Sequence, residues 1–304
     1  MQTFIMLVGL PGSGKSTFAQ IHKDNAVWLS SDKIREKLFG NAEIQKNPSE
    51  VFDLMKKETK KALLSGQNVI YDACNINSRR RRGFLSELGK IPCQKICYIM
   101  ATPYEVCLRQ NKKRNRVVPE EAIQRMYYNF QTPFYHEGWD EIHILYHEDI
   151  SKEFFGNPFE KIVKLHELEH DNPHHKESVG KHMANAYALI QKPPYREMPS
   201  SNLAFATLFH DIGKERTKVF HNAKGEETEI AHYYHHENVG AYDIFFYDLW
   251  KPEKDLLEIS LLINLHMRPF NWNASKQLKI LGEDLYDKLV KLHEVDEKAS
   301  EKEM

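Results

Sequence analysis

The stretch TFIMLVGLPGSGKSTF, residues 3–18, places an apolar run before a glycine-rich loop and a helical pattern after it. Within it, residues 9–16 fit the spacing G-x-x-x-x-G-K-[ST]. Glycines in such a loop let the backbone curl until its N–H groups face phosphate oxygens, and the N-terminus of the following helix adds partial positive charge. The stretch therefore predicts a buried strand, a phosphate-binding loop and a helix in direct succession.

The loop also predicts how a nucleoside triphosphate and its metal ion are held. Lys15 is expected to reach the β- and γ-phosphates of ATP, and Ser16 to ligate Mg²⁺. A glycine-rich turn that binds nothing is disfavoured, because the strand, the loop and the helix all lie where the motif requires them. The residues expected to contact ATP are Gly12, Ser13, Gly14, Lys15, Ser16 and Thr17.

The rest of the chain divides into two patterns. Strand-like apolar runs at 3–8, 26–30, 68–73, 94–101 and 141–147 alternate with helical stretches. This alternation predicts an α/β domain over residues 1–150, with a parallel sheet covered by helices on both faces. From about residue 160, apolar residues recur three and four positions apart, which predicts an all-α domain over residues 151–304.

Composition limits the class of protein. The chain has 304 residues, a net charge of −1, 41% hydrophobic and 28% charged residues, which indicates two soluble globular domains and no disordered or collagen-like chain. All four cysteines lie in the first 110 residues and favour buried thiols in a reducing cytosol over metal ligands. No apolar run has membrane-spanning length and no cleavable leader is evident, so we expect a cytoplasmic protein without a membrane partner.

A second motif, WLSSDKIREKL, indicates where the phosphate acceptor binds. Asp32 and Arg35 follow an apolar run, so both are expected at the carboxyl end of a strand, facing the phosphates. The Asp32 carboxylate can accept a proton from an attacking hydroxyl, and Arg35 can hold an acceptor phosphate. The alternative is a helix cap at Ser31 or Asp32 beside a solvated Arg35.

Four blocks of the first domain resemble the phage-type polynucleotide 5′-kinases: GLPGSGKST, SSDKIR, YDACNINSRRRR and LRQNKKRNRVVPEEAIQRMYYNF. They occur in the same order and cover about residues 1–147. The resemblance implies that Lys15 and Ser16 bind ATP and magnesium, that Asp32 is the general base, and that Arg35 holds the acceptor phosphate. It also implies a lid arginine before a Val-Pro pair, for which Arg114 is favoured over Arg116.

The arginine run at residues 79–82 has two interpretations. Four consecutive like charges usually form a solvated face, and this interpretation is slightly favoured. Beside an acceptor cleft, they could instead follow the phosphates of a nucleic-acid strand. The net charge near zero argues against broad nonspecific binding and leaves room only for a narrow basic channel.

Histidine is concentrated in the second half, where twelve of the sixteen lie at or after His166. A single histidine on an apolar helix face is usually a core residue. Here, however, several lie on separate predicted helices or helix ends, together with carboxylates, and helical bundles build metal centres in this way. The segments concerned contain His182, His210 with Asp211, His236, His266 and Asp296.

The order His, His-Asp, His, His, Asp over residues 160–300 resembles the HD phosphohydrolase superfamily. The resemblance implies one divalent ion at His182, His210, Asp211 and Asp296, and a second at His236 and His266, with Asp211 bridging. Lys214, one turn after His210, would contact a substrate phosphate. An imidazole and carboxylate shell suits Mn²⁺, Fe²⁺, Co²⁺, Ni²⁺ or Zn²⁺.

Five further positions bear on these assignments. His235, Asp287 and His293 are the residues most easily mistaken for ligands, because each lies close in sequence to an expected one. The pair at 174 and 175, both histidines, is slightly favoured to face the substrate rather than to be inert in a loop.

Two catalytic halves suggest coupled chemistry on one substrate. The combination resembles fused enzymes that heal broken RNA or DNA ends, which phosphorylate a 5′-hydroxyl with ATP and hydrolyse a 2′,3′-cyclic, 2′ or 3′ phosphate. We therefore expect nucleic-acid ends as substrates and, because the sequence contains no ligase motif, a separate RNA ligase as partner. The alternatives are a nucleoside or small-molecule kinase with an HD nucleotidase, and an HD module that senses nucleotides. The oligomeric state is not predicted.

Overall fold

The computed structural model describes residues 1–42, 47–146, 156–172, 177–269 and 273–300. They form two compact units, one of Met1–Tyr127 with Pro133–Ser151 and one of Tyr128–Thr132 with Lys152–Met304. The expected domains, 1–150 and 151–304, differ from these units at the segment Tyr128–Thr132, which belongs to the second unit. The expected change of pattern between them falls partly on residues 147–155, outside the described residues.

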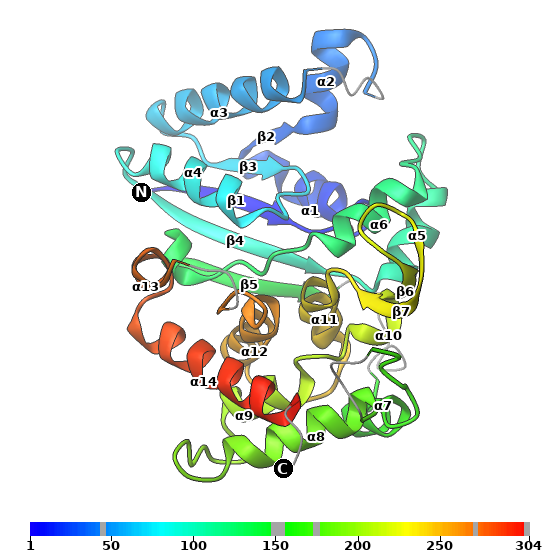
Figure 1. Cartoon of the computed structure of the whole chain (residues 1–304). Helices are drawn as coiled ribbons and strands as arrows, with labels where there is room; N and C mark the ends of the chain where they lie inside the picture. The colour runs from blue at the N-terminus through cyan, green and yellow to red at the C-terminus, as the bar shows by residue number, and fades with distance from the viewer. Residues whose placement is uncertain (43–46, 147–155, 173–176, 270–272, 301–304) are drawn as a thin grey trace. The chain divides into compact units, whose positions relative to one another are not determined.

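The first unit is built on a five-stranded parallel sheet of order β2-β3-β1-β4-β5 (Figure 1). Its strands are β1 (Gln2–Val8), β2 (Val27–Ser30), β3 (Val69–Asp72), β4 (Cys93–Ala101) and β5 (Glu141–Tyr146). Its helices are α1 (Lys15–His22), α2 (Ser31–Phe39), α3 (Pro48–Leu64), α4 (Ser78–Leu88), α5 (Tyr104–Lys112) and α6 (Glu120–Tyr128). The predicted parallel sheet with connecting helices is confirmed.

The register of the sheet brings three chain segments to one edge. Asp72 at the end of β3 is paired with Leu7 of β1 on one side and with Ser30 of β2 on the other. Because parallel strands end at the same edge, the loop after β1, the start of α2 after β2 and Asp72 itself lie next to one another. The strands are apolar because this sheet is covered, and all four residues of β3 are buried.

One of the four consecutive arginines is part of the core. Arg81 is 1% exposed and donates from Nε and Nη2 to the two carboxylate oxygens of Glu137, at 2.8 and 2.7 Å. Trp139 Nε1 also donates to Glu137, at 2.9 Å. Arg79 and Arg80 are exposed, so the expected solvated face is wrong for Arg81, whose buried bidentate pair is a structural contact.

The second unit is mainly helical. Its helices are α7 (Pro158–Leu165), α8 (Val179–Ile190), α9 (Asn202–Phe209), α10 (Lys214–Thr217), α11 (His236–Asp243), α12 (Glu253–Leu265), α13 (Ala274–Leu281) and α14 (Glu283–Ser300). A two-stranded antiparallel hairpin of β6 (Lys218–His221) and β7 (Glu227–Tyr233) interrupts them. This hairpin departs from the predicted all-α domain, because its strands are short, largely exposed and alternate too briefly to stand out from the helical pattern.

The segment Tyr128–Thr132 packs into this helical unit. Phe130 is fully buried against the rings of Tyr242 and Phe245. Asn264 Nδ2 donates to the Phe130 carbonyl at 3.1 Å, and Asn238 Nδ2 donates to the Tyr128 carbonyl at 2.8 Å. Side-chain amides of α11 and α12 therefore satisfy backbone groups of a segment that follows the predicted first-domain helix in the chain.

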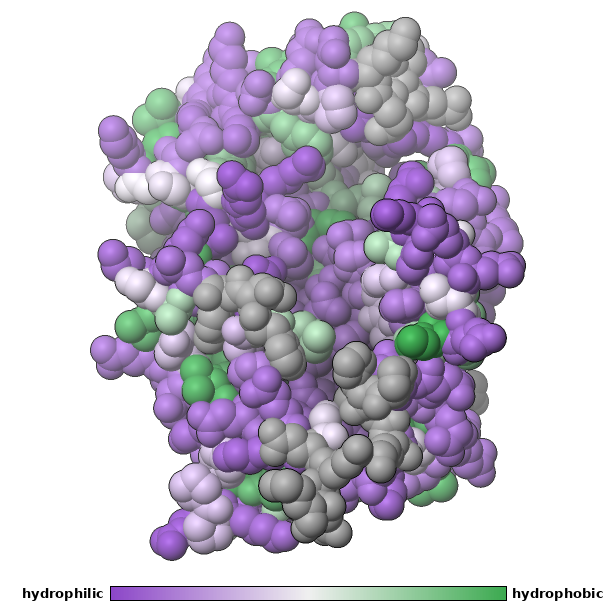
Figure 2. Space-filling model, in the orientation of Figure 1, coloured by the Kyte–Doolittle hydropathy of each residue, from purple (hydrophilic) through white to green (hydrophobic). Residues whose placement is uncertain are grey.

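The surface is hydrophilic over most of the face that Figure 2 shows, with apolar residues scattered over it. Among the described residues, no helix combines the length and the apolarity needed to cross a bilayer.

The burial of Phe130 predicts a stability effect. Phe130→Ala should lower the free energy of opening of α11 and α12 by about 3–5 kcal/mol, because it removes a fully buried ring and leaves a cavity. Amide hydrogen exchange resolved to these two helices measures it. The matched control is Phe159→Ala in α7. Because Phe159 is 56% exposed, this substitution should change the free energy of opening by less than about 0.5 kcal/mol. Equal effects of the two substitutions would contradict the packing described.

Candidate active sites

The loop between β1 and α1 has the backbone that phosphate binding requires. Gly12 and Gly14 have φ angles of +83° and +89°, in the left-handed region that other residues rarely adopt. A Cβ at Gly12 would also lie 2.3 Å from the Cys107 carbonyl oxygen, so only glycine fits there. Gly14 caps the N-terminus of α1, which therefore opens onto the loop.

The remaining predicted nucleotide contacts lie in or beside this loop. Lys15 is 8% exposed, and its Nζ donates to the carbonyls of Gly9 at 3.0 Å and Leu10 at 2.6 Å. Ser13 is buried within the loop, and Thr17 is exposed in the first turn of α1. The lysine ammonium is thus held over the loop interior, where phosphate oxygens would exchange with the carbonyls.

Asp72 is a functional candidate to which the sequence analysis gave no role. Ser16 Oγ donates to Asp72 Oδ2 at 3.0 Å, and Trp28 Nε1 donates to the same oxygen at 3.1 Å. A loop hydroxyl beside a carboxylate at the end of a neighbouring strand is the pair that holds Mg²⁺ in phosphate-loop enzymes. In the sequence, the only signal for a role of Asp72 is that a carboxylate ends an apolar strand. The order of the sheet shows that this strand, β3, lies beside β1 and therefore beside the phosphate loop.

Asp32 lies at the start of α2 and is surrounded by arginines. Arg35 Nη1 lies 3.0 Å from Asp32 Oδ1, Arg114 Nη2 lies 3.5 Å from Oδ2, and Arg116 Nη1 contacts Oδ1. Arg35 is 7% exposed, and its burial lowers the pKa of its guanidinium below the ordinary value. Both lid candidates, Arg114 and Arg116, therefore face the expected base, and Arg116 makes the closer contact.

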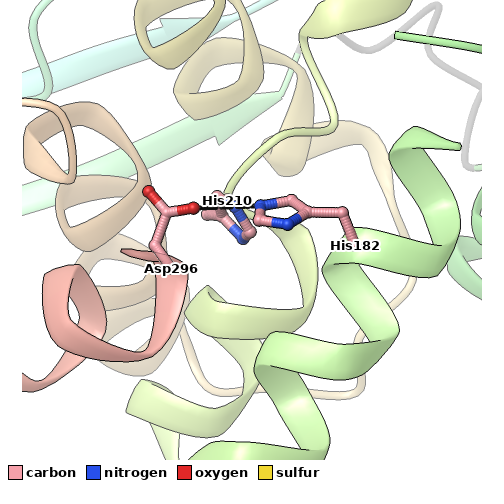
Figure 3. A group of neighbouring side chains, drawn as sticks. All are labelled: His182, His210 and Asp296. Atoms are coloured by element: carbon pink, nitrogen blue, oxygen red, sulfur yellow. Dashed lines mark hydrogen bonds and ion pairs between the residues drawn. The ribbon is translucent and has the colours of Figure 1, made fainter. Parts of the chain in front are cut away.

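In the second unit, three of the predicted metal ligands form one cluster. His182 lies in α8, His210 follows the last residue of α9, and Asp296 lies in α14 (Figure 3). His182 Nε2 lies 3.2 Å from His210 Nε2 and 2.9 Å from Asp296 Oδ1, and His210 Nε2 lies 3.3 Å from the same oxygen. All three are buried. We call this the first triad.

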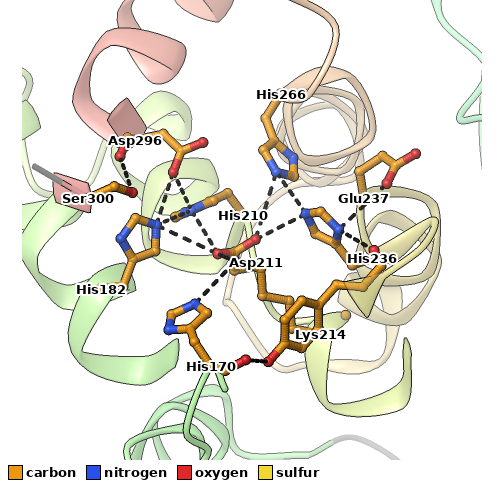
Figure 4. Close-up of polar contacts among 12 residues, drawn as sticks. His170, His182, His210, Asp211, Lys214, His236, Glu237, His266, Asp296 and Ser300 are labelled. Carbon is orange, nitrogen blue, oxygen red and sulfur yellow. Dashed lines mark hydrogen bonds and ion pairs between the residues drawn. The ribbon is translucent and has the colours of Figure 1, made fainter. Parts of the chain in front are cut away.

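Asp211, His236 and His266 form a second triad whose ligand atoms lie within 4.8 Å of one another. Asp211 Oδ1 is 3.1 Å from His236 Nε2 and 3.8 Å from His266 Nε2. Its other oxygen, Oδ2, is 3.3 Å from His210 Nε2 of the first triad. As Figure 4 shows, the Asp211 carboxylate lies between the two groups, in the position of a bridging ligand.

The imidazole orientations fit metal binding. The Nδ1 atoms of His210, His236 and His266 each donate to a backbone carbonyl three residues earlier, at 2.7, 2.8 and 2.8 Å. Such a bond places a proton on Nδ1 and directs Nε2 into the cluster, where it can serve as a ligand once it carries no proton. The described residues thus supply two sets of nitrogen and oxygen donors suited to divalent transition metals.

The two triads differ in charge. Burial disfavours a charged imidazole, but the carboxylates of Asp211 and Asp296 outweigh it and raise the pKa of His210 to about 10. For His266, burial and the adjacent His236 lower the pKa to about 3. At neutral pH, His210 therefore carries a proton that a metal ion must displace, whereas His266 is already neutral.

Lys214 lies beside the bridging carboxylate, where the sequence analysis expected a phosphate contact. Its Nζ is 2.6 Å from Asp211 Oδ2 and 3.2 Å from Nε2 of His170, a buried residue that the sequence analysis did not single out. Burial would raise the pKa of Asp211, but Lys214 and His210 hold it well below its usual range. For His170, burial and then Lys214 lower the pKa to about 4.

The positions most easily mistaken for ligands belong to neither triad. His235 is exposed, Asp287 pairs with Lys291 at 2.9 Å, and His293 lies 3.6 Å from Glu297. The histidines at 174 and 175 lie outside the described residues.

Two protein families match separate parts of the chain. Residues 4–133 match the AAA domain family, and residues 178–296 match the HD domain family. The chain therefore combines a P-loop kinase-like domain with a helical HD domain, as the sequence analysis expected.

Individual relatives match only part of the chain. It is 31% identical over 146 residues to L-seryl-tRNA(Sec) kinase of Methanococcus maripaludis, which covers 45% of this chain and 55% of that protein. Two chains from structures of the Pnkp1/Rnl/Hen1 RNA repair complex are 25% identical, with TM-scores of 0.38 and 0.34; they cover 41% and 39% of this chain and 42% and 40% of their own. The chain thus spans about half the length of the relatives it matches.

The Ser16 and Asp72 pair predicts a magnesium effect. Asp72→Asn keeps an acceptor for Trp28 but removes the charge, so we expect the Mg²⁺ concentration for half-maximal ATP turnover to rise about 10- to 100-fold. Titration of turnover with Mg²⁺ measures it. Asp53→Asn, at an exposed carboxylate of α3, is the control and should leave the titration unchanged. An unshifted titration for Asp72→Asn would remove this residue from the site.

The raised pKa of His210 predicts proton-coupled metal binding. Because His210 is protonated below about pH 10, binding of Mn²⁺ at the first triad should release about one proton, and the apparent affinity should rise about tenfold per pH unit between about pH 7 and 9. Calorimetry in buffers of different ionisation enthalpy counts the protons. In His210→Gln this proton should be absent from the count. A pH-independent affinity for the unsubstituted protein would contradict the prediction.

Proposed function

We propose that this protein is a bifunctional end-healing enzyme for RNA or DNA. The first domain would transfer the γ-phosphoryl group of ATP to a 5′-hydroxyl end, and the HD domain would hydrolyse a 2′,3′-cyclic, 2′ or 3′ phosphate end. The observation that carries the proposal is that one chain holds both Asp32 among three arginines beside a phosphate loop and two metal-binding triads, with the Asp211 carboxylate lying between them.

In the kinase domain, each residue has a role that its contacts support. Lys15 would bind the β- and γ-phosphates, with Ser16 and Asp72 holding Mg²⁺. Asp32 would accept the proton of the attacking hydroxyl. Arg35, buried and anchored at Asp32, would hold the acceptor phosphate next to that hydroxyl, which favours a nucleotide acceptor over a phosphate-free one. A lid arginine, Arg114 or Arg116, would stabilise charge on the transferring group.

In the HD domain, the two triads would hold two divalent ions drawn from Mn²⁺, Fe²⁺, Co²⁺, Ni²⁺ or Zn²⁺. Bound ions of this kind activate water and stabilise the leaving oxygen of a phosphoester. The chain's own part is to fix the ligands: backbone carbonyls orient the imidazoles, and Asp211 joins the two sites. Lys214 would contact a phosphate oxygen of the substrate.

Healed ends need a separate enzyme to join them. A 5′-phosphate and a 3′-hydroxyl are the ends that ligases use, and we propose an RNA ligase as the partner that follows this protein. The likeness to L-seryl-tRNA(Sec) kinase favours one other candidate, a kinase whose acceptor hydroxyl is the serine carried by a transfer RNA.

The test uses an RNA oligonucleotide with a 5′-hydroxyl and a 2′,3′-cyclic phosphate, incubated with ATP, Mg²⁺ and Mn²⁺. Lys15→Ala should lower 5′ phosphorylation at least about a hundredfold and leave the other end reaction intact, because it removes a cation from the transferring phosphoryl group. Asp211→Ala should do the reverse, because the second triad loses a ligand and the first loses the neighbouring carboxylate that would bridge to it. Gel separation and mass spectrometry of the two ends report each reaction.

Seryl-transfer RNA and free nucleosides are the comparison acceptors in the same assay. If unsubstituted protein changes neither end of the oligonucleotide, the end-healing proposal fails. Phosphorylation of seryl-transfer RNA alone would favour the second candidate.

A further inference from the structure

His170 occupies a position beside the two triads that the proposed reaction has not used. It is 1% exposed and lies in the chain segment between α7 and α8. Its Nδ1 is 2.6 Å from the Glu177 carbonyl oxygen, which can only accept. The proton is therefore on Nδ1, and the Nε2 lone pair is directed away from that carbonyl.

That lone pair is aimed at Lys214. His170 Nε2 lies 3.2 Å from Lys214 Nζ, and the ammonium donates to it (Figure 4). Lys214 is itself 6% exposed, so its charge needs acceptors inside the protein. Its carboxylate partner is Asp211, whose Oδ2 forms an ion pair with Nζ at 2.6 Å.

Tyr233 holds this arrangement from a further side. Its hydroxyl donates to the His170 carbonyl at 2.6 Å, and Lys214 Nζ lies 5.3 Å from the centre of its ring. The segment that carries His170 is thereby tied to the end of β7, and the ammonium lies near the negative face of the ring. Lys214 is consequently confined by three different groups.

The acceptors of Lys214 are not equivalent. In the proposed two-metal site, Asp211 would also serve as the bridging ligand between the triads, and bound cations would withdraw its electron density from the lysine. His170 supplies no ligand to either triad. It is the acceptor that remains for Lys214 when Asp211 is engaged, and it leaves a further ammonium N–H for a phosphate oxygen.

We infer that His170 is a positioning residue of the HD domain, which holds the Lys214 ammonium toward the substrate phosphate by accepting a hydrogen bond at Nε2. The inference rests on the proposed phosphohydrolase function of that domain. It goes beyond that function in giving Lys214 a dedicated partner outside the metal ligands.

Two substitutions separate the two hydrogen bonds of His170. In His170→Gln, the longer side chain places an amide oxygen near the Nε2 position and keeps an acceptor for Lys214. In His170→Asn, the shorter amide keeps a donor for Glu177 but does not reach Lys214. If His170 acts only through Glu177, His170→Asn should keep more phosphate affinity than His170→Gln. If it acts through Lys214, as inferred, His170→Gln should keep more.

The first measurement is calorimetric binding of inorganic phosphate to the full-length, Mn²⁺-loaded protein. His170→Asn should weaken binding about tenfold or more, the worth of a hydrogen bond that positions a charged group, and His170→Gln should stay within about threefold of the unsubstituted protein. The metal content of each variant, from elemental analysis, should be unchanged. Equal phosphate affinity in His170→Asn and His170→Gln, or loss of metal from either variant, would overturn the inference.

A double-mutant cycle decides whether His170 acts through Lys214. In a Lys214→Met background, His170→Asn should produce no further loss of phosphate affinity, because the group that it positions is gone. Additive losses would overturn the inference. Phosphate binding does not depend on the RNA substrate: if the oligonucleotide ends are not hydrolysed and the cycle is still non-additive, the proposed substrate fails and the role of His170 stands.

Discussion

The arrangement of the helices around the second domain's candidate metal site depends on the contacts of the buried Asp211 carboxylate. It is 2% exposed, faces His210 on one oxygen and His236 and His266 on the other, and also pairs with Lys214. A charge this deeply buried is stable only when cations and donors surround it. Since these groups come from separate helices, the ends of α9, α11 and α12 must meet at one point, and the adjacent His-Asp pair sets that point.

The helices that carry the second triad are joined by amides rather than by apolar packing alone. Asn238 follows His236 by two positions and Asn264 precedes His266 by two, and Asn264 Nδ2 donates to Asn238 Oδ1 at 2.9 Å. Both amides also hold carbonyls of the segment Tyr128–Thr132. The geometry of this triad is therefore linked to a stretch of chain that lies before residue 150, and a fragment beginning at residue 151 would lack it.

Sequence patterns were sufficient to predict those features that depend on residues close together in the chain. The glycine spacing of residues 9–16 and the alternation around it predicted the parallel sheet, and five helix-borne positions with Asp211 predicted a cluster that the structure brings together. Three features depended on contacts distant in sequence: the burial of Arg81 against Glu137, the place of Asp72 beside Ser16, and the contact of His170 with Lys214. None has a periodic or spacing signal, because each partner is chosen by tertiary packing.

In both candidate sites, each cationic side chain expected to bind phosphate already has a partner within the protein. Lys15 has the Gly9 and Leu10 carbonyls, Arg35 has Asp32, and Lys214 has Asp211 and His170. When a phosphate binds to one of these cations, it replaces an acceptor that the cation already has. The binding free energy is therefore smaller than that of a new ion pair. In the proposed kinase reaction, this exchange would release Asp32 in particular, and a carboxylate freed from arginines is a better proton acceptor. Phosphate binding and activation of the proposed base would then be coupled through the same side chains.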